Sequence, residues 1–162
     1  MRRTAALSWL MSLGASLLAC SASVGPASGV WAPDSASTVV NAPYTSMSDA
    51  RLAVISDAAT WQQTWAQTFA ILRPQPPVPG VDFSAHGVVL AALGSRPSGG
   101  FSITIDSVVH SAAEDIVFVT STSPGSGCLV TQVITAPVTA VVTPWPVGAV
   151  TWRSRSVTLN CS

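Results

Sequence analysis

The stretch that decides the fold reads VVLAALGSRPSGGFSITID, residues 88–106. It opens with six consecutive apolar residues, and from Phe101 onward every second residue is apolar. Strict alternation is typical of a strand with one buried face. The residues between the two patterns are rich in Gly, Pro and Ser, which favour turns. We therefore expect strands at 87–93 and 101–109, joined through the loop 94–101 as a β-hairpin.

A strand that runs into a glycine-rich loop is also how a phosphate-binding P-loop begins. Gly94 and Gly99 have the spacing of that motif, but its Lys position holds Gly100 and its Ser/Thr position holds Phe101. A strand pattern follows instead of the helix that a phosphate site needs. A nucleotide site is thereby excluded. The loop is expected to be an exposed connection, with Arg96 pointing outward and Gly99 or Gly100 at positive φ.

Upstream of this stretch, residues 51–55 are predicted to form a short strand, followed by a helix that Ser56 or Asp57 caps. The helix is expected to end at the proline-rich segment 74–79. Its apolar residues fall on one face: Trp61, Trp65, Phe69 and Leu72. Such a stripe favours the core, and a ligand-stacking role for the Trp pair is the alternative.

After Gly80 the pattern changes to a period of two, and turn residues separate the segments. Further strands are predicted at 115–122, 129–136, 138–143 and 149–158. The expected fold class is α+β and dominated by β, with a mostly antiparallel sheet and one amphipathic helix packed on it.

The composition favours one globular domain, which we expect to span residues 39–162. The chain has 162 residues, a formal net charge of zero, and seven cationic side chains, all of them Arg. A nucleic-acid partner is excluded because phosphate binding depends on clustered positive charge.

The N-terminus is predicted to be a lipoprotein signal peptide, residues 1–19. Arg2 and Arg3 form a basic region, and an apolar segment too short to span a membrane follows. The sequence then reads LLAC, which resembles a bacterial lipobox ending in Cys20. We expect Cys20 to be lipidated and the protein to be anchored in the bacterial cell envelope, facing the periplasm or the exterior. The alternative is an ordinary signal peptide that happens to contain a Cys.

Residues 20–38 are rich in Ser, Ala, Gly and Pro, and we expect them to form a flexible tether. Trp31 is an unusual residue for a tether. Two roles are open for it: docking on the domain or contact with lipid headgroups.

The cysteine count predicts a disulfide. Cys20, Cys128 and Cys161 are the three cysteines of the chain. If Cys20 carries lipid, an exported protein can pair the other two as Cys128–Cys161. A metal site or a catalytic thiol is the rival interpretation, but the sequence has neither C-x-x-C nor H-E-x-x-H. No metal and no other cofactor is expected.

The motifs from Val81 onward resemble the PrcB C-terminal domain family over roughly residues 80–143. The pieces that carry the resemblance are an Asp-Phe opening, a strand ending in Gly, an R-P-x-G-G-aromatic-S-I segment, a P-G-x-G-C segment and a T-Q pair before a Pro. In this sequence they are Asp82-Phe83, Gly94, residues 96–103, residues 124–128, Thr131-Gln132 and Pro137. Phe101 departs from the pattern, because Tyr is common at that position.

The resemblance implies an envelope lipoprotein that is associated with a protease complex. The namesake of the family helps a secreted serine protease to mature or to remain stable, and the family is not established as enzymatic. A secreted or envelope protease is therefore the expected partner. No protease-contacting residue carries over from the family to this sequence.

The sequence shows no catalytic constellation, and we expect no enzymatic activity. Nucleophilic hydrolysis needs a Ser or Cys beside a base, and the imidazoles available are those of His86 and His110. Both lie at strand ends and are expected to be solvated. The acidic pair Glu114 and Asp115 is expected to be solvated in a turn.

The candidate partner-binding residues lie in the first glycine-rich loop: Arg96, Pro97, Gly99, Gly100 and Phe101. Their backbone N–H groups and the guanidinium could serve a peptide carbonyl or carboxylate. The alternative for Arg96 is a solvated charge, or an ion pair with Asp82 or Asp106. The loop SPGSGC is expected at the same end of the sheet. Two other functions are open: a structural envelope lipoprotein without a defined ligand, and a protease inhibitor with loops similar to those of chagasin.

Overall fold

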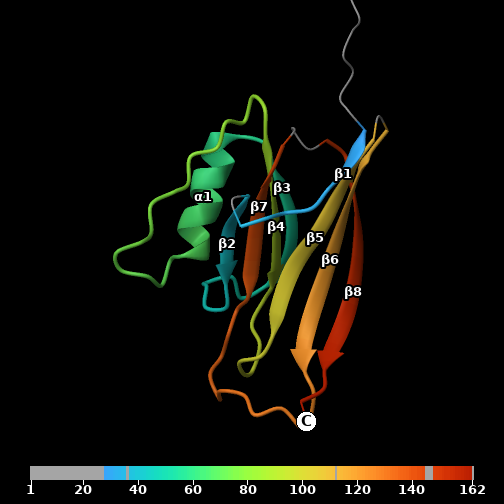
Figure 1. Ribbon diagram of the computed structural model, residues 1–162. Coiled ribbons are helices and arrows are strands. Elements are labelled where there is room, and N and C mark those ends of the chain that lie inside the picture. Colours follow the sequence, from blue (N-terminus) through green and yellow to red (C-terminus); the bar gives the residue numbers. More distant parts are fainter. Residues whose placement is uncertain (1–27, 36, 112, 145–147, 162) are drawn as a thin grey trace, which may run out of the picture.

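The computed structural model describes residues 28–35, 37–111, 113–144 and 148–161. Cys20 and the predicted signal peptide lie outside the described residues. The described parts form one helix and eight strands (Figure 1). The elements are β1 (Gly29–Trp31), β2 (Thr38–Ala42), β3 (Ala50–Ile55), α1 (Ala58–Thr68), β4 (Gly87–Leu93), β5 (Ser102–His110), β6 (Asp115–Pro124), β7 (Val138–Thr143) and β8 (Val150–Leu159).

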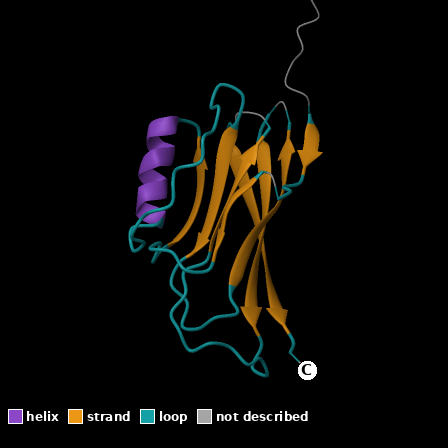
Figure 2. Cartoon of the chain, turned by 60° about the vertical axis from the view of Figure 1, so that its left-hand side comes forward, coloured by secondary structure: helices purple, strands orange, loops and turns teal. Residues whose placement is uncertain are grey.

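The strands form two sheets that pack face to face, and α1 covers the far side of one of them (Figures 1 and 2). Sheet A has the order β1-β5-β6-β8, and sheet B has the order β2-β7-β4-β3. All strand pairs are antiparallel except β6 with β8, which run parallel. The predicted class, α+β and dominated by β, is confirmed; the division into two sheets is new.

Strand β4 is the centre of the molecule, and all seven of its residues are buried. Val88, Leu90 and Ala92 face the helix layer, whereas Val89 and Ala91 face sheet A. A strand that is covered on both faces gains from apolar residues at every position. This burial explains why the run is continuous instead of alternating.

Helix α1 begins after Asp57, whose carboxylate accepts hydrogen bonds from the backbone N–H of Thr60 at 2.8 Å and from its hydroxyl at 2.7 Å. These bonds satisfy a helix N-terminus. The bond from the Thr60 N–H, above all, lowers the pKa of Asp57. The predicted cap is therefore confirmed at Asp57.

The aromatic stripe of α1 packs on sheet B, so the core role predicted for it is confirmed. Trp61 and Trp65 are 2% and 5% exposed, and their rings meet edge to face with centroids 5.3 Å apart. Each indole N–H donates to a carbonyl of the proline-rich segment, Trp61 to Pro79 at 3.0 Å and Trp65 to Pro76 at 2.8 Å. The prediction for Leu72 was wrong: it lies beyond the helix and is partly exposed, because α1 ends at Thr68.

One predicted hairpin and one predicted strand were wrong. In both places the chain crosses from one sheet to the other. β4 belongs to sheet B and β5 to sheet A, so residues 94–101 connect the two sheets and do not close a hairpin. The segment 129–136 is not a strand. Its one ladder contact is an isolated bridge between Thr135 and Arg96, and residues 131–134 are exposed while the chain crosses from β6 back to β7.

Part of the expected tether 20–38 belongs to the sheets. Gly29–Trp31 forms β1, which pairs with the end of β5. Trp31 is partly buried against the core between the sheets, so it docks on the domain. The remaining predicted strands lie within two residues of their expected bounds.

Candidate functional site

Three connecting segments meet at one end of the sandwich, here called the loop end: residues 43–49, 94–101 and 125–136 (Figure 1). The backbone N–H of Ser95 donates to Ser48 at 2.8 Å, and that of Ala136 donates to Pro43 at 2.9 Å. The N–H of Gly99 donates to Thr131 at 2.9 Å. These bonds join the three segments into one surface, as predicted for the two glycine-rich loops.

Glycine is required at the start of the segment 94–101, which crosses between the sheets and is here called the crossing loop. Gly94 has φ 74°, and a Cβ there would lie 2.7 Å from the N of Ala50 and 2.8 Å from the O of Ser48. Both the left-handed backbone and the close approach of β3 therefore exclude a side chain. The positive φ predicted for Gly99 or Gly100 is found at Gly100, with φ 84°.

Arg96 does not point outward, which corrects the prediction for this side chain. Its guanidinium donates to the carbonyl of Leu93 at 2.8 Å and lies 6.0 Å from the centroid of the Phe101 ring. Its backbone exchanges two hydrogen bonds with Thr135, at 2.7 and 3.0 Å. Arg96 thus fastens the loop to its neighbours, because its donors meet a carbonyl and an aromatic face that are close in the chain.

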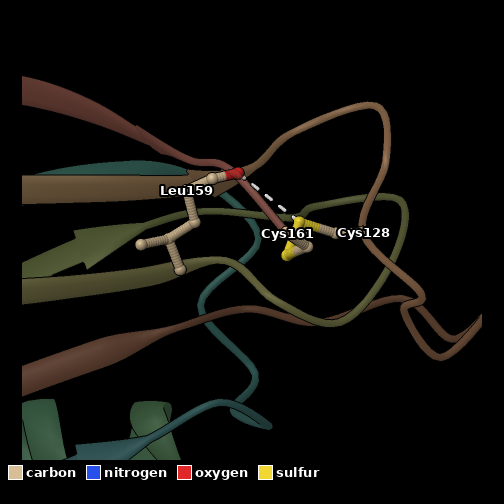
Figure 3. Close-up of a disulfide and its surroundings, with 3 residues drawn as sticks. All are labelled: Cys128, Leu159 and Cys161. Carbon is tan, nitrogen blue, oxygen red and sulfur yellow. Dashed lines mark hydrogen bonds between the residues drawn. A yellow bond between two sulfur atoms is a disulfide. The ribbon is translucent and has the colours of Figure 1, made fainter.

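The predicted disulfide between Cys128 and Cys161 is present, with Cα atoms 4.9 Å apart (Figure 3). It ties the end of β8 to the loop that follows β6. The backbone N–H of Gly125 donates to the carbonyl of Leu159 at 2.8 Å, and the same oxygen lies 3.4 Å from the sulfur of Cys128. The C-terminal strand is therefore fixed at the loop end.

The loop end also carries exposed apolar side chains that the sequence analysis did not identify. Tyr44, Ile71 and Ile134 are 50%, 63% and 72% exposed, and they line one shallow hollow of about 130 Å³ with polar neighbours. We call these three residues the apolar patch. Ile134 lies in the segment that was predicted as a strand, where an apolar residue is expected to be buried. Ile134 was missed for that reason, and no pattern in the sequence pointed to Tyr44 or Ile71.

The side chains of His110 and Asp115 are hydrogen-bonded at the opposite end of the sandwich, where β5 ends and β6 begins. The side chains are 10% and 3% exposed, so the expected solvation of both was wrong. The second carboxylate oxygen of Asp115 accepts the backbone N–H of Gly148 at 2.8 Å. The pair thus fixes the chain that leads into β8. Glu114, by contrast, is exposed and accepts the hydroxyl of Thr151 at 2.6 Å.

His86 stands in a turn that Asp82 closes. The carboxylate of Asp82 accepts the hydroxyl of Ser84 at 2.6 Å and its backbone N–H at 3.0 Å. These hydrogen bonds lower the pKa of Asp82. The arrangement is an ordinary Asx turn at the entry to β4.

Within the described residues, no three His, Cys, Asp or Glu side chains are grouped closely enough to hold a metal ion. Among the same residues, no helix is long and apolar enough to cross a membrane. The predictions for Cys20 and for the tether upstream of β1 stay predictions.

Searches of curated proteins and of solved structures found no significant match to this chain. A comparison with family models matches residues 88–144 to the family described as PrcB C-terminal. The matched segment begins in β4, includes both crossing loops, and ends just past β7. The central part of the chain is therefore similar to the PrcB C-terminal family, as its motifs predicted.

Proposed function

We propose that this protein is a non-catalytic, lipid-anchored binding module of an envelope protease complex, and that it contacts its partner through the loop end. The observation that carries the proposal is the apolar patch. Tyr44, Ile71 and Ile134 expose large apolar surfaces on connecting segments that a buried scaffold holds in place. Exposed apolar groups with a polar rim are typical of protein-binding surfaces.

The crossing loop contributes to this surface by shape. The positive φ of Gly94 lets the loop approach β3 closely. Arg96 holds the loop through its contacts with Leu93, the Phe101 ring and the backbone of Thr135. A binding surface that is already ordered loses less entropy when a partner docks. Pro97 and Gly100 are exposed and complete the predicted contact region beside the patch. Gly99 was also predicted to contact a partner, but it is buried and its N–H donates to Thr131.

The position of the loop end fits an anchored protein. β1 enters the sandwich at the end opposite the loop end (Figure 1). A lipid on Cys20 would therefore hold the opposite end toward the membrane and leave the apolar patch directed away from it. Mass spectrometry of the membrane form should find a diacyl or triacyl mass on Cys20, and Cys20→Ala should move the protein to the soluble fraction. A membrane-bound Cys20→Ala protein of unchanged mass would refute the anchor.

Co-purification from detergent-solubilised membranes tests the binding function. The wild-type protein should retain a protease that a serine-directed activity probe labels, in constant stoichiometry. Ile134→Ser should lower the retained amount at least tenfold, because it removes apolar surface from the patch. Val30→Ser is the matched control: Val30 is 73% exposed, like Ile134 at 72%, but lies on β1.

Equal retention by the Ile134→Ser and Val30→Ser variants would remove the patch from the interface. Absence of any labelled protease in the wild-type preparation would favour a structural envelope lipoprotein. If the protease is retained, adding the purified domain to it separates the remaining alternatives. A stabilising module prolongs activity, and an inhibitor with chagasin-like loops lowers it.

A further inference from the structure

Strand β8 is the edge strand of sheet A, and none of its side chains is fully buried. None of its ten residues is buried, and from Arg153 onward all are exposed. Val150 and Trp152 at its start pack against the core between the sheets. The remaining length of β8 therefore gains little from apolar burial.

Backbone pairing and polar side chains keep β8 in place. It pairs with β6 in a parallel register over its whole length, from Val150 to Leu159. The hydroxyl groups of Ser121 and Ser156 lie 3.0 Å apart, and Arg155 donates its Nε–H to the Thr120 hydroxyl at 2.8 Å. The disulfide at Cys161 closes the far end. β8 is thus a preorganised strand that one neighbour supports.

The hydrogen bonds of β8 show which of its backbone groups face away from β6. The carbonyls of Arg155 and Val157 accept the hydroxyl groups of Ser121 and Ser123, which lie on β6. Within a sheet, the N–H and C=O of one residue point toward the same neighbouring strand, and those of the next residue point the other way. The N–H and C=O groups of Ser154, Ser156 and Thr158 therefore point to the open edge. No other strand of the described residues pairs there, since β8 is last in the order of sheet A.

Positive charge gathers along this edge. Arg153 and Arg155 project from β8, and Arg51 lies on β3, the edge strand of sheet B. A groove of about 360 Å³ opens between the two edges, with Arg51, Leu52 and Ser154 among the residues that line it. Asp106 lines the same hollow as Arg153 and Arg155, and its carboxylate accepts the hydroxyl groups of Thr120 at 2.5 Å and Thr104 at 3.2 Å. The edge thus offers hydrogen-bonding backbone groups between Arg51 in the groove on one face and Arg153 and Arg155 on the other face of sheet A.

We propose that the edge of β8 binds an extended acidic segment of a partner protein as an added strand. Backbone groups of the partner would pair with Ser154, Ser156 and Thr158, and its carboxylates would face Arg51, Arg153 or Arg155. This surface is separate from the apolar patch and extends the proposed function.

A second copy of the chain is a poor occupant of the same edge. An antiparallel pair of β8 strands centred on Ser154 would set Arg153 of each copy opposite Arg155 of the other. Like charges directly opposite each other destabilise a sheet. The same arginines attract a strand that carries carboxylates.

A fluorescent ten-residue peptide in which Glu alternates with Val or Thr serves as the probe, with a Lys-for-Glu peptide of equal length as its counterpart. The full disulfide-bonded domain should bind the Glu peptide at least tenfold more tightly than the Lys peptide in fluorescence anisotropy. The double variant Arg153→Glu, Arg155→Glu should reverse this preference. Arg73→Glu is the control, because Arg73 follows α1, which packs on sheet B, and its guanidinium donates to the carbonyls of Ala70 and Leu72.

Two further variants separate the edge from the loop end. Ser154→Pro removes an outward N–H without changing charge, and it should weaken binding of the Glu peptide. Ile134→Ser should leave that binding unchanged even where it abolishes protease retention. Hydrogen exchange at Ser154 and Ser156 should slow on binding. Equal binding of the two peptides, an unchanged preference in the double arginine variant, or a dimer in sedimentation would overturn the proposal.

Discussion

β4 and β8 are both regular strands, yet the surrounding structure stabilises them in different ways. All seven residues of β4 are buried between sheet A and the helix, whereas none of the ten residues of β8 is buried. β4 is stabilised by the removal of apolar surface from water. β8 depends on its ladder to β6, on hydroxyl groups and on a covalent link. A change of side-chain volume in β4 therefore costs stability. In β8 the backbone provides most of the stability, so its side chains are available for binding.

The largest expected effect comes from β4. Leu90→Ala should lower the free energy of unfolding by about 2–5 kcal/mol, because it leaves a cavity against the helix layer. Val157→Ala in β8, at a residue 38% exposed, should change it by about 0.5 kcal/mol or less. Urea unfolding measures both, and similar losses for the two variants would contradict the contrast.

Removal of the disulfide tests how much the Cys128–Cys161 link stabilises β8. The double variant Cys128→Ser, Cys161→Ser opens a loop with a sequence separation of 33 residues, which the chain-entropy model values at about 3–4 kcal/mol. Hydrogen exchange should accelerate in β8 and stay slow in β4. An equal acceleration in the two strands would show that β8 is part of the same cooperative core.

The crossing loop joins the two regions, and Gly94 is its most constrained residue. Gly94→Ala should cost about 1–3 kcal/mol in backbone strain alone, and the contact with β3 adds to that loss. Gly29→Ala is the control, since a Cβ there would meet no atom within 4 Å. Thermal unfolding compares the variants, and equal midpoints would contradict the conformation assigned to Gly94.

The smallest effect concerns the cap of the helix that covers β4. The pKa of Asp57 lies below its usual 3.8 in the folded protein, so the carboxylate stabilises the fold above that pH. This contribution is lost as the pH falls through the folded pKa. Asp57→Asn keeps an acceptor and removes the titration.

The melting temperature of Asp57→Asn should therefore depend less on pH than that of the wild-type protein in the acid range. Asp82 remains in the variant and supplies the residual dependence, because its pKa is lowered in the same direction. An identical pH dependence of the two proteins would argue against a titrating cap.

Local structure was predictable wherever one segment carries its own signal. The bounds of β4 and β7 were predicted as observed, and Asp57 was one of the two predicted caps. The disulfide followed from cysteine counting. Gly100 at positive φ followed from turn chemistry. These features depend on periodicity and on residue types within a few positions, which the sequence states directly.

Contacts between segments that lie far apart in the sequence were not predictable in the same way. Arg96 was expected to face solvent, but Leu93, Phe101 and Thr135 occupy its donors and its backbone. His110 was expected to be solvated, but its side chain is 10% exposed and contacts Asp115, which also accepts the N–H of Gly148. Each of these contacts depends on partners that other segments bring near.

The sequence by itself determined the strands β3 to β8, the helix, and that two cysteines can pair. It did not identify β1 or β2, and it wrongly predicted a strand at 129–136. The tertiary structure alone decided that β4 and β5 lie in different sheets, that β8 runs parallel to β6, and that Ile134 is exposed. The physical reason is that a period of two fixes the faces of a strand but does not identify its neighbour. The choice of neighbour depends on which apolar faces cover each other once the whole chain is folded.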